Sequence, residues 1–384
     1  MNTKSKHHLD VQPFDKGSSR LVDRDWFLLD GKWDDAVWTF KPTSVLEEAK
    51  PVRIRWDFAL HHGGRFTDKH QSALLEASKQ LMALIRGRAL TTGMAQRANT
   101  VAGYFSYLRV LVRWMDKVDL SRFADLDEEA IQEFRRYINE RAGRARTGLS
   151  ATTTEKYLYL FAYMYRFREE LQDGLTFDPF PGQTLGQVAG VREAEIRRLP
   201  YTPDAVAMSL IQGSIDLLDH MAVPILQARS VYAQAMSEAV RRGCQLDACT
   251  NAANSALRQS RIELPYPGTV IQSVGSLAHL IDMLYGACFV IISYLVGARA
   301  SEILQLHAGC VDFRGDSRAP ITVIVGAIFK RQPEYHGRRH EWVAPPKAVQ
   351  AVRVLEELSA PHRLQAKRPH LWLRRSGAQG ANEW

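Results

Sequence analysis

The stretch Tyr294–Phe313, YLVGARASEILQLHAGCVDF, joins an apolar helix to a region of strands. The 16 residues before Arg299 carry no charge, and Gly297 predicts the end of the helix that they form. Arg299 then begins a short second helix, with Glu302 one turn further on. A guanidinium directly after so apolar a stretch is expected to be buried and to need an anion. That anion is either the Glu302 carboxylate or the phosphate of a ligand, and the sequence leaves both open.

The residues after this stretch predict a β-hairpin and then a helix. Ile321–Phe329 is β-branched and apolar, and His340–Ala344 is a shorter run of the same kind. A polar, basic turn that begins at Lys330 joins the two runs. Pro346–Leu358 then returns to a helical pattern. Before the quoted stretch, residues 203–240 predict one or two helices, and residues 276–295 predict a buried one.

Further upstream, the spacing of apolar residues predicts four helices between residues 66 and 180. Asp127 and Ser150 stand where the N-caps of the third and fourth helices are expected. Arginines before the fourth helix and hydroxyls in its first turn are suited to holding phosphate. These predicted contacts are Arg141, Arg144, Arg146, Ser150, Thr152, Thr153 and Lys156. A capped helix after a solvated, charged loop has the same pattern, and this alternative stays open.

The composition is that of a globular protein. The chain has 384 residues, with 50 Lys and Arg against 42 Asp and Glu, and a pI of about 9.3. This excludes a disordered chain, a collagen-like repeat and a disulfide-rich miniprotein, and it permits nucleic-acid binding without requiring it. The charge-free stretch is shorter than the roughly 18 residues of a membrane span, and no signal peptide is evident. We therefore expect a soluble, intracellular protein with no membrane partner.

The predicted organisation has four parts. An N-terminal arm, residues 1–65, carries two short strands at Ala36–Phe40 and Val52–Phe58. A helical domain follows at 66–180, then a linker rich in Gly and Pro at 181–204, and then a second domain at 205–384. The expected fold class is mainly α, with a helical bundle followed by an α+β domain that holds the hairpin.

The quoted stretch also resembles the first arginine motif of the tyrosine recombinase, or phage integrase, family. In that motif an apolar helix precedes Gly-x-Arg-x-x-Glu-(Ile/Leu)-x-x-Leu, and an Asp follows at the start of a strand. The matching positions are Gly297, Arg299, Glu302, Leu306 and Asp312. The hairpin with Lys330 resembles the family's hairpin with its catalytic lysine. The sequence of residues 149–167, LSATTTEKYLYLFAYMYRF, is similar to part of the family's core-binding domain, and the whole resemblance covers roughly residues 68–375.

The resemblance implies a SAM-like core-binding bundle and a partial α+β integrase catalytic domain. It implies a site-specific recombinase of a mobile element, which cleaves and rejoins double-stranded DNA through a phosphotyrosyl intermediate. Arg299 would hold the phosphate oxygens, Glu302 would hold Arg299, and Lys330 would protonate the leaving 5′-oxygen. The resemblance also implies self-association on DNA, no cofactor, no metal, and a location in the bacterial cytosol or nucleoid.

The family's remaining motifs are not found where the resemblance places them. A His-x-x-Arg motif and a nucleophilic tyrosine are expected well after the hairpin. His336–Arg339 spells the first but lies in the predicted turn, and Tyr335 is the only tyrosine after Arg299. We therefore expect a catalytic domain truncated before these motifs, with the nucleophile absent. The alternatives are a non-catalytic DNA-binding relative with an accessory or regulatory role, and a helical scaffold for protein partners.

Overall fold

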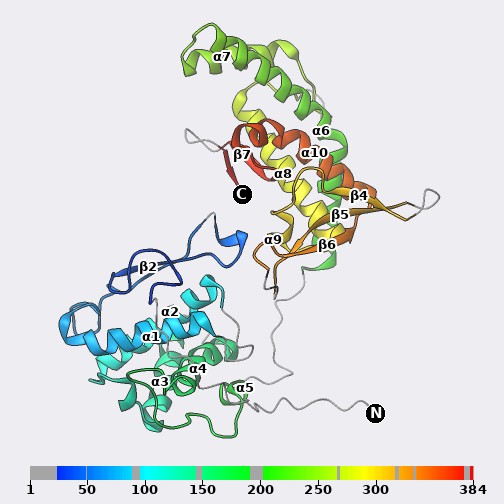
Figure 1. The fold of residues 1–384 in the computed structure, drawn as a ribbon. Helices are drawn as coiled ribbons and strands as arrows, with labels where there is room; N and C mark the ends of the chain where they lie inside the picture. Colours follow the sequence, from blue (N-terminus) through cyan, green and yellow to red (C-terminus); the bar gives the residue numbers. More distant parts are fainter. Residues whose placement is uncertain are drawn as a thin grey trace, which may run out of the picture. The chain divides into compact units, whose positions relative to one another are not determined.

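The computed structural model describes residues 24–48, 50–88, 96–143, 149–190, 202–265, 269–315, 320–330, 332, 334–375 and 381–383. The chain divides into two compact units, Met1–Ile196 and Arg197–Trp384, each with its own hydrophobic core (Figure 1). The division lies within residues 181–204. Helices predominate in the described part and the sheets are small, so the predicted mainly-α fold class is confirmed.

The first unit contains the helices predicted between residues 66 and 180. They are α1 (Ser72–Gly87), α2 (Ala98–Lys117), α3 (Glu128–Gly143) and α4 (Ala151–Arg166), followed by the short α5 (Leu185–Val188). The backbone N–H of Thr153 donates to the Ser150 hydroxyl at 3.2 Å. The N–H of Ala130 likewise donates to the Asp127 carboxylate at 2.8 Å. Both predicted N-caps are therefore confirmed.

A three-stranded antiparallel sheet packs on these helices. It consists of β1 (Leu28–Asp30), β2 (Val37–Phe40) and β3 (Arg53–Arg55), in the order β1-β2-β3. Trp38 and Trp56 are fully buried with ring centroids 5.0 Å apart, and Trp56 meets Phe105 of α2 at 4.9 Å. Residues 24–65 thus share one core with the helices. The strand predicted at Val52–Phe58 is shorter than expected, since β3 spans only Arg53–Arg55. The Trp56 N–H still donates to the Ala36 carbonyl at 2.8 Å, and the Trp56 and Phe58 side chains lie in this aromatic core.

Helices form the core of the second unit. They are α6 (Asp204–Arg241), α7 (Leu246–Ser260), α8 (Val274–Val296), α9 (Ala300–Ile303) and α10 (Pro346–Ala366). One or two helices were predicted over residues 203–240, and the structure has the single helix α6 there, which continues through Pro224. α7 was not predicted, because it buries only small or isolated apolar residues, such as Cys249 and Ala253. α10 continues eight residues beyond the predicted end at Leu358.

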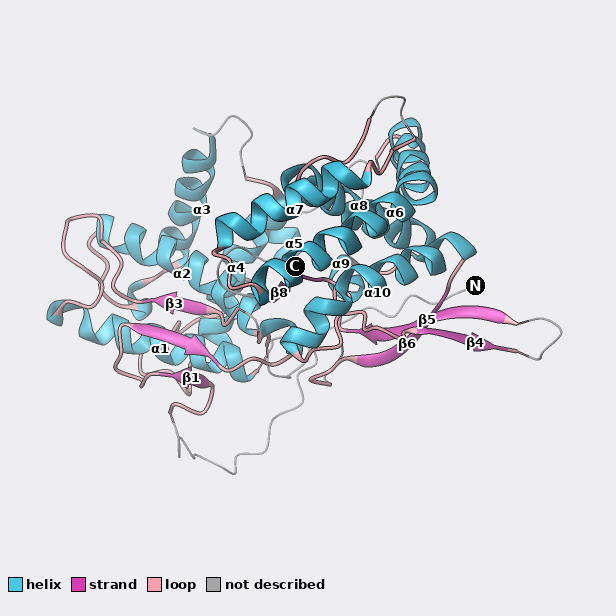
Figure 2. Ribbon diagram, turned by 90° about the horizontal axis from the view of Figure 1, so that it is seen from above, coloured by secondary structure: helices cyan, strands magenta, loops and turns pink. Residues whose placement is uncertain are grey.

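The predicted hairpin belongs to a second antiparallel sheet. Its strands are β4 (Val311–Arg314), β5 (Ile321–Ile328) and β6 (Arg338–Val343), in the order β4-β5-β6 (Figure 2). The β5–β6 pairing runs from Val323 opposite Val343 to Ile328 opposite Arg338. β6 begins at Arg338, two residues before the predicted start at His340. Gly337, with φ of +72°, makes the turn that leads into it. A short pair, β7 (Leu373–Arg375) and β8 (Ala381–Glu383), follows α10.

Helix α8 is long and apolar enough, by length and composition, to cross a membrane. The sequence predicted no such span. Within the second unit α8 contacts α6, α7 and α10, and its residues Leu284, Cys288 and Ile291 are fully buried in the core. These contacts, with 33% of the apolar window buried, are compatible with a soluble protein.

Candidate functional site

Arg299 and Glu302 form a fixed pair at the start of α9. α8 ends at Gly297, which has φ of +73°, and Arg299 is the residue just before α9. The Glu302 carboxylate accepts two hydrogen bonds at 2.8 Å, one from the backbone N–H of Arg299 and one from its guanidinium Nη1. The predicted proximity of these two residues is confirmed. The Trp372 indole donates to the Ile303 carbonyl at 2.7 Å, which holds the other end of α9.

The Arg299 side chain is 57% exposed, so the prediction that it is buried is wrong. The chain reaches the surface at Gly297, two residues before Arg299, and Glu302 is the buried member of the pair, with 2% exposure. Among the described residues, the Nε and Nη2 groups of Arg299 have no hydrogen-bond partner. The guanidinium is therefore anchored on one side by a buried carboxylate, and its other donors can fork onto the oxygens of an anion. The sequence left open whether Arg299 pairs with Glu302 or with the phosphate of a ligand, and in this arrangement it can bind both at once.

Lys330 lies one residue beyond the buried Phe329, where the chain leaves β5, and it is exposed. Within the described ranges it has no ion-pair partner. Lys347, a competing lysine, donates instead to the Asp219 carboxylate of α6 at 2.6 Å. α9, which follows Arg299, contacts β5, the strand that precedes Lys330.

The His336–Arg339 motif lies at the hairpin, where the sequence placed it. Arg338 and Arg339 belong to β6, and Arg339 pairs with Glu341 of the same strand at 3.2 Å. Tyr335 is half-buried in the turn, and its ring centroid lies 5.1 Å from that of His336.

A charged network crosses one face of the β4-β5-β6 sheet. The Arg314 guanidinium donates to both oxygens of Glu341, at 2.9 and 2.6 Å, and to Asp312 at 2.7 Å. These hydrogen bonds hold the pKa of the Asp312 and Glu341 carboxyls below the usual range. Arg314 thus ties β4 to β6 through Glu341, and Asp312 holds the Arg314 side chain from the same strand.

In the first unit, the start of α4 has the predicted hydroxyl-rich cap. The Ser150 hydroxyl lies 3.0 Å from that of Thr152 and 2.8 Å from that of Thr153. Thr152 and Lys156, one turn apart, are both exposed. These positions are compatible with phosphate contact, which stays a prediction. Arg144 and Arg146 lie outside the described residues.

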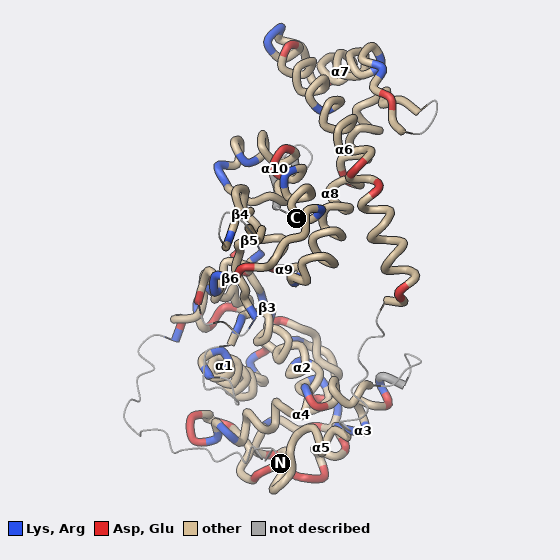
Figure 3. Tube along the Cα trace, turned by 90° about the vertical axis from the view of Figure 1, so that its right-hand side faces the viewer, with Lys and Arg blue, Asp and Glu red and all other residues tan. Residues whose placement is uncertain are grey.

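Arg141, at the end of α3, has two basic neighbours that the sequence analysis missed. Burial lowers the pKa of the Arg113 guanidinium, and the charges of Arg109 and Arg141 lower it further. Arg109 and Arg113 are four residues apart on α2 and therefore lie on one face of that helix. That spacing is readable in the sequence and would have found the pair, but not its proximity to α3. Figure 3 shows basic positions in both units.

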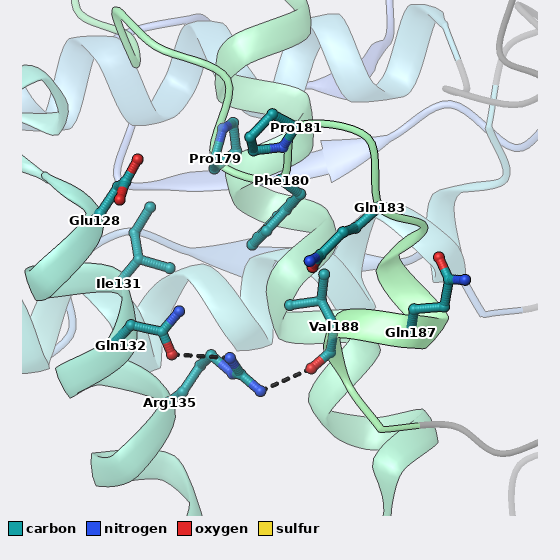
Figure 4. A pocket seen from close by; sticks show the side chains of 10 residues that line it. All are labelled: Glu128, Ile131, Gln132, Arg135, Pro179, Phe180, Pro181, Gln183, Gln187 and Val188. Atoms are coloured by element: carbon teal, nitrogen blue, oxygen red, sulfur yellow. Dashed lines mark hydrogen bonds between the residues drawn. The ribbon is translucent and has the colours of Figure 1, made fainter.

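A hollow of about 410 Å³ lies on the first unit, between α3 and the segment that contains α5 (Figure 4). Its apolar floor includes Ile131 and Phe180, and Arg135 crosses it to donate to Gln132 at 2.8 Å and to the Val188 carbonyl at 2.7 Å. None of the sequence-predicted site residues lines it. The guanidinium of Arg135 is engaged in holding α3 to α5.

No protein-family model matches the chain, and a search of curated proteins finds no match. The resemblance to tyrosine recombinases therefore rests on the motif positions themselves.

Proposed function

We propose that this chain binds double-stranded DNA as a site-specific recombinase or integrase of the tyrosine recombinase type, with Arg299 on the phosphate that is cleaved. The observation that supports the proposal is the Arg299–Glu302 pair. A buried carboxylate fixes the main chain and the side chain of Arg299, while the remaining guanidinium donors face no protein acceptor among the described residues. An arginine held in this way is preorganised for an anion.

The recombinase reaction needs the chemistry that these residue types supply. A tyrosine hydroxyl attacks the phosphodiester, a phosphotyrosyl link forms, and the 5′-oxygen leaves. Negative charge builds on the non-bridging oxygens, and the permanently charged guanidinium of Arg299 stabilises it. Lys330, exposed at the end of β5, protonates the leaving oxygen. Loss of one such preorganised donor typically lowers the rate about 10²–10³-fold.

The nucleophile is not assigned to any residue of this chain. Tyr335, the only tyrosine after Arg299 in the sequence, is half-buried in the hairpin turn beside His336. This observation favours a second candidate function, that of an accessory or regulatory DNA-binding protein. Under either function we expect the chain alone to bind DNA without a covalent link.

We also propose that the two units correspond to the two domains of a tyrosine recombinase. Residues 66–180 are the SAM-like core-binding domain, and residues 205–384 belong to the integrase catalytic domain. Self-association on DNA and a location in the bacterial cytosol or nucleoid are further parts of it. A helical scaffold for protein partners, the remaining alternative, requires no affinity for DNA.

The test for covalent chemistry uses a pool of nicked duplexes with randomised flanking sequence. The protein is incubated with the pool and then analysed by denaturing electrophoresis. We expect no covalent protein–DNA band from the wild type, because no assigned residue attacks phosphorus. A band that disappears in Tyr335→Phe and in Arg299→Ala would contradict the accessory function and assign the nucleophile to Tyr335.

A further inference from the structure

Three arginines of the first unit gather without a carboxylate. Arg109 and Arg113 project from one face of α2, and Arg141 from the end of α3. Within the described part of the chain, none of the three forms an ion pair, whereas Arg314 of the second unit has two acidic partners. The Nε of Arg109 is buried with no hydrogen-bond partner among those residues. Like charges held together in this way repel one another and favour a bound anion.

Arg113 is held in place by the segment between β3 and α1. Its Nε donates to the Ala59 carbonyl at 2.9 Å, and its guanidinium lies 5.4 Å from the centroid of the Phe58 ring. The Nε donor and one face of the guanidinium are thus engaged, and both terminal nitrogens are left without a hydrogen-bond partner among the described residues. The Nη1 and Nη2 groups, which together can donate to two phosphate oxygens, are therefore available to a ligand.

Aromatic rings lie beside Arg113 and near Arg141. Lys117, one turn beyond Arg113 on α2, lies 5.4 Å from the Tyr137 ring centroid. Arg141 lies within electrostatic reach of Tyr157, whose ring centroid is 4.7 Å from that of Tyr107. Tyr157 follows Lys156 on α4. Tyrosine hydroxyls, like arginine guanidiniums, donate to the phosphate oxygens of a nucleic-acid backbone.

We propose that Arg109, Arg113 and Arg141 bind the phosphate backbone of duplex DNA, and that Phe58 and Ala59 position Arg113 for that contact. The proposal rests on the proposed DNA binding and adds to it a phosphate site on α2 and α3. It also gives the N-terminal sheet a role, because the segment after β3 orients a binding residue without touching the ligand. Phe58 is accordingly a positioning residue.

The test measures the affinity for a labelled random duplex at several salt concentrations, for the wild type and for Arg113→Gln and Arg141→Gln. The control is Arg136→Gln, which removes an exposed arginine of α3 that pairs with Glu133 at 3.9 Å. We expect each site variant to bind about tenfold more weakly, and the slope of log K against log salt to shrink by about 0.9. Arg136→Gln should match the wild type.

Two further variants test the positioning role. Phe58→Leu removes the ring face but keeps an apolar side chain, and Phe58→Tyr keeps the ring face. We expect Phe58→Leu to weaken binding and lower the slope as Arg113→Gln does, and Phe58→Tyr to restore both. Thermal unfolding of each variant shows that the first unit is folded at the assay temperature. A Phe58→Leu protein that is folded and binds like the wild type would overturn the positioning role.

The outcomes separate this proposal from the proposed function. If the wild type does not bind duplex DNA, the proposed function fails, and this inference fails with it. If the wild type binds and Arg113→Gln and Arg141→Gln match Arg136→Gln, the phosphate site alone is overturned. A thermal shift in inorganic phosphate at constant ionic strength, lost in Arg113→Gln without any loss of DNA affinity, would assign the site to free phosphate and overturn the DNA contact.

Discussion

At the scale of single residues, Glu302 determines what Arg299 can do. The carboxylate is buried and the guanidinium is exposed, so loss of the arginine leaves a charge in the core, whereas loss of the glutamate leaves a charge in water. A buried charge without its partner is costly, and a solvated one is not. The pair therefore responds asymmetrically to substitution.

Arg299→Ala is expected to destabilise the second unit by about 2–3 kcal/mol, because Glu302 then keeps only its bond from the Arg299 backbone N–H. The double variant Arg299→Ala/Glu302→Gln should recover part of that loss, because the amide can accept the same bond without a charge. Urea unfolding of the two single variants and the double variant measures the coupling. Strictly additive losses would contradict the asymmetry.

Lys79 fixes the N-terminal sheet to α1. It is 4% exposed, and its ammonium donates to the Trp33 carbonyl at 2.6 Å and lies about 6 Å from the Trp38 and Trp56 ring centroids, at 5.8 and 6.0 Å. Burial lowers the pKa of this ammonium. The sequence offered no signal for this role, because the rings and the carbonyl come from a different part of the chain.

We expect Lys79→Ala to destabilise the first unit by about 2–4 kcal/mol, through loss of a charged hydrogen bond and the cation–π contacts. Lys79→Met should cost less, because the chain still fills the space and the Trp33 carbonyl keeps its bond from the Trp38 indole at 3.1 Å. Thermal unfolding compares the two. A Lys79→Met variant as stable as the wild type would mean that packing, rather than the ammonium, holds the sheet.

At the scale of elements, helix periodicity and capping residues predicted α1 to α4 well, because each buries a regular apolar face and Asp127 and Ser150 cap two of them. The elements that were missed depend on distant partners. β1 is a three-residue strand that exists through its pairing with β2, and α7 buries few large side chains. The prediction that Arg299 is buried was wrong, because its exposure depends on where α8 reaches the surface. The local sequence pattern does not predict that position.

The charged network on the β4-β5-β6 sheet predicts that the stability of the second unit depends on pH. The folded-state pKa of Asp312 and of Glu341 lies below the unfolded value, mainly because Arg314 donates to both carboxylates. Their contribution is complete above the unfolded pKa, roughly 4, and is lost as the pH falls through the lower folded value. It is small, because the groups are exposed and salt screens them.

Arg314→Gln should therefore lower the melting temperature of the second unit at pH 7 and should have less effect at pH 3, below the unfolded pKa of these carboxyls, where the wild type has begun to lose the same interactions. Scans from pH 7 to pH 3 at low salt, repeated at about 1 M salt, measure the difference. Melting curves that stay equally far apart at every pH would show that the network contributes through packing and not through charge.

At the scale of the whole molecule, the chain holds two units that each present exposed arginine donors, and DNA binding is the property that would unite them. The composition permitted this function, and the motif around Arg299 suggested it. The sequence alone did not reveal Arg109 and Arg113 as neighbours of Arg141, because that proximity requires α2 and α3 to pack together. The anchored pair at α9 and the arginines of α2 and α3 are separate sites, so each can be removed without the other.

The measurement that tests the central claim most directly is the salt dependence of duplex binding. Wild type, Arg299→Ala and Arg353→Ala are titrated against a labelled random duplex, Arg353 being an exposed arginine on α10 of the same unit. We predict that the wild type binds at low salt with a steep negative slope of log K against log salt. The slope should shrink by about 0.9 in Arg299→Ala alone, as one phosphate contact is lost. A wild type that does not bind at low salt, or an Arg299→Ala variant that matches Arg353→Ala, would contradict the account.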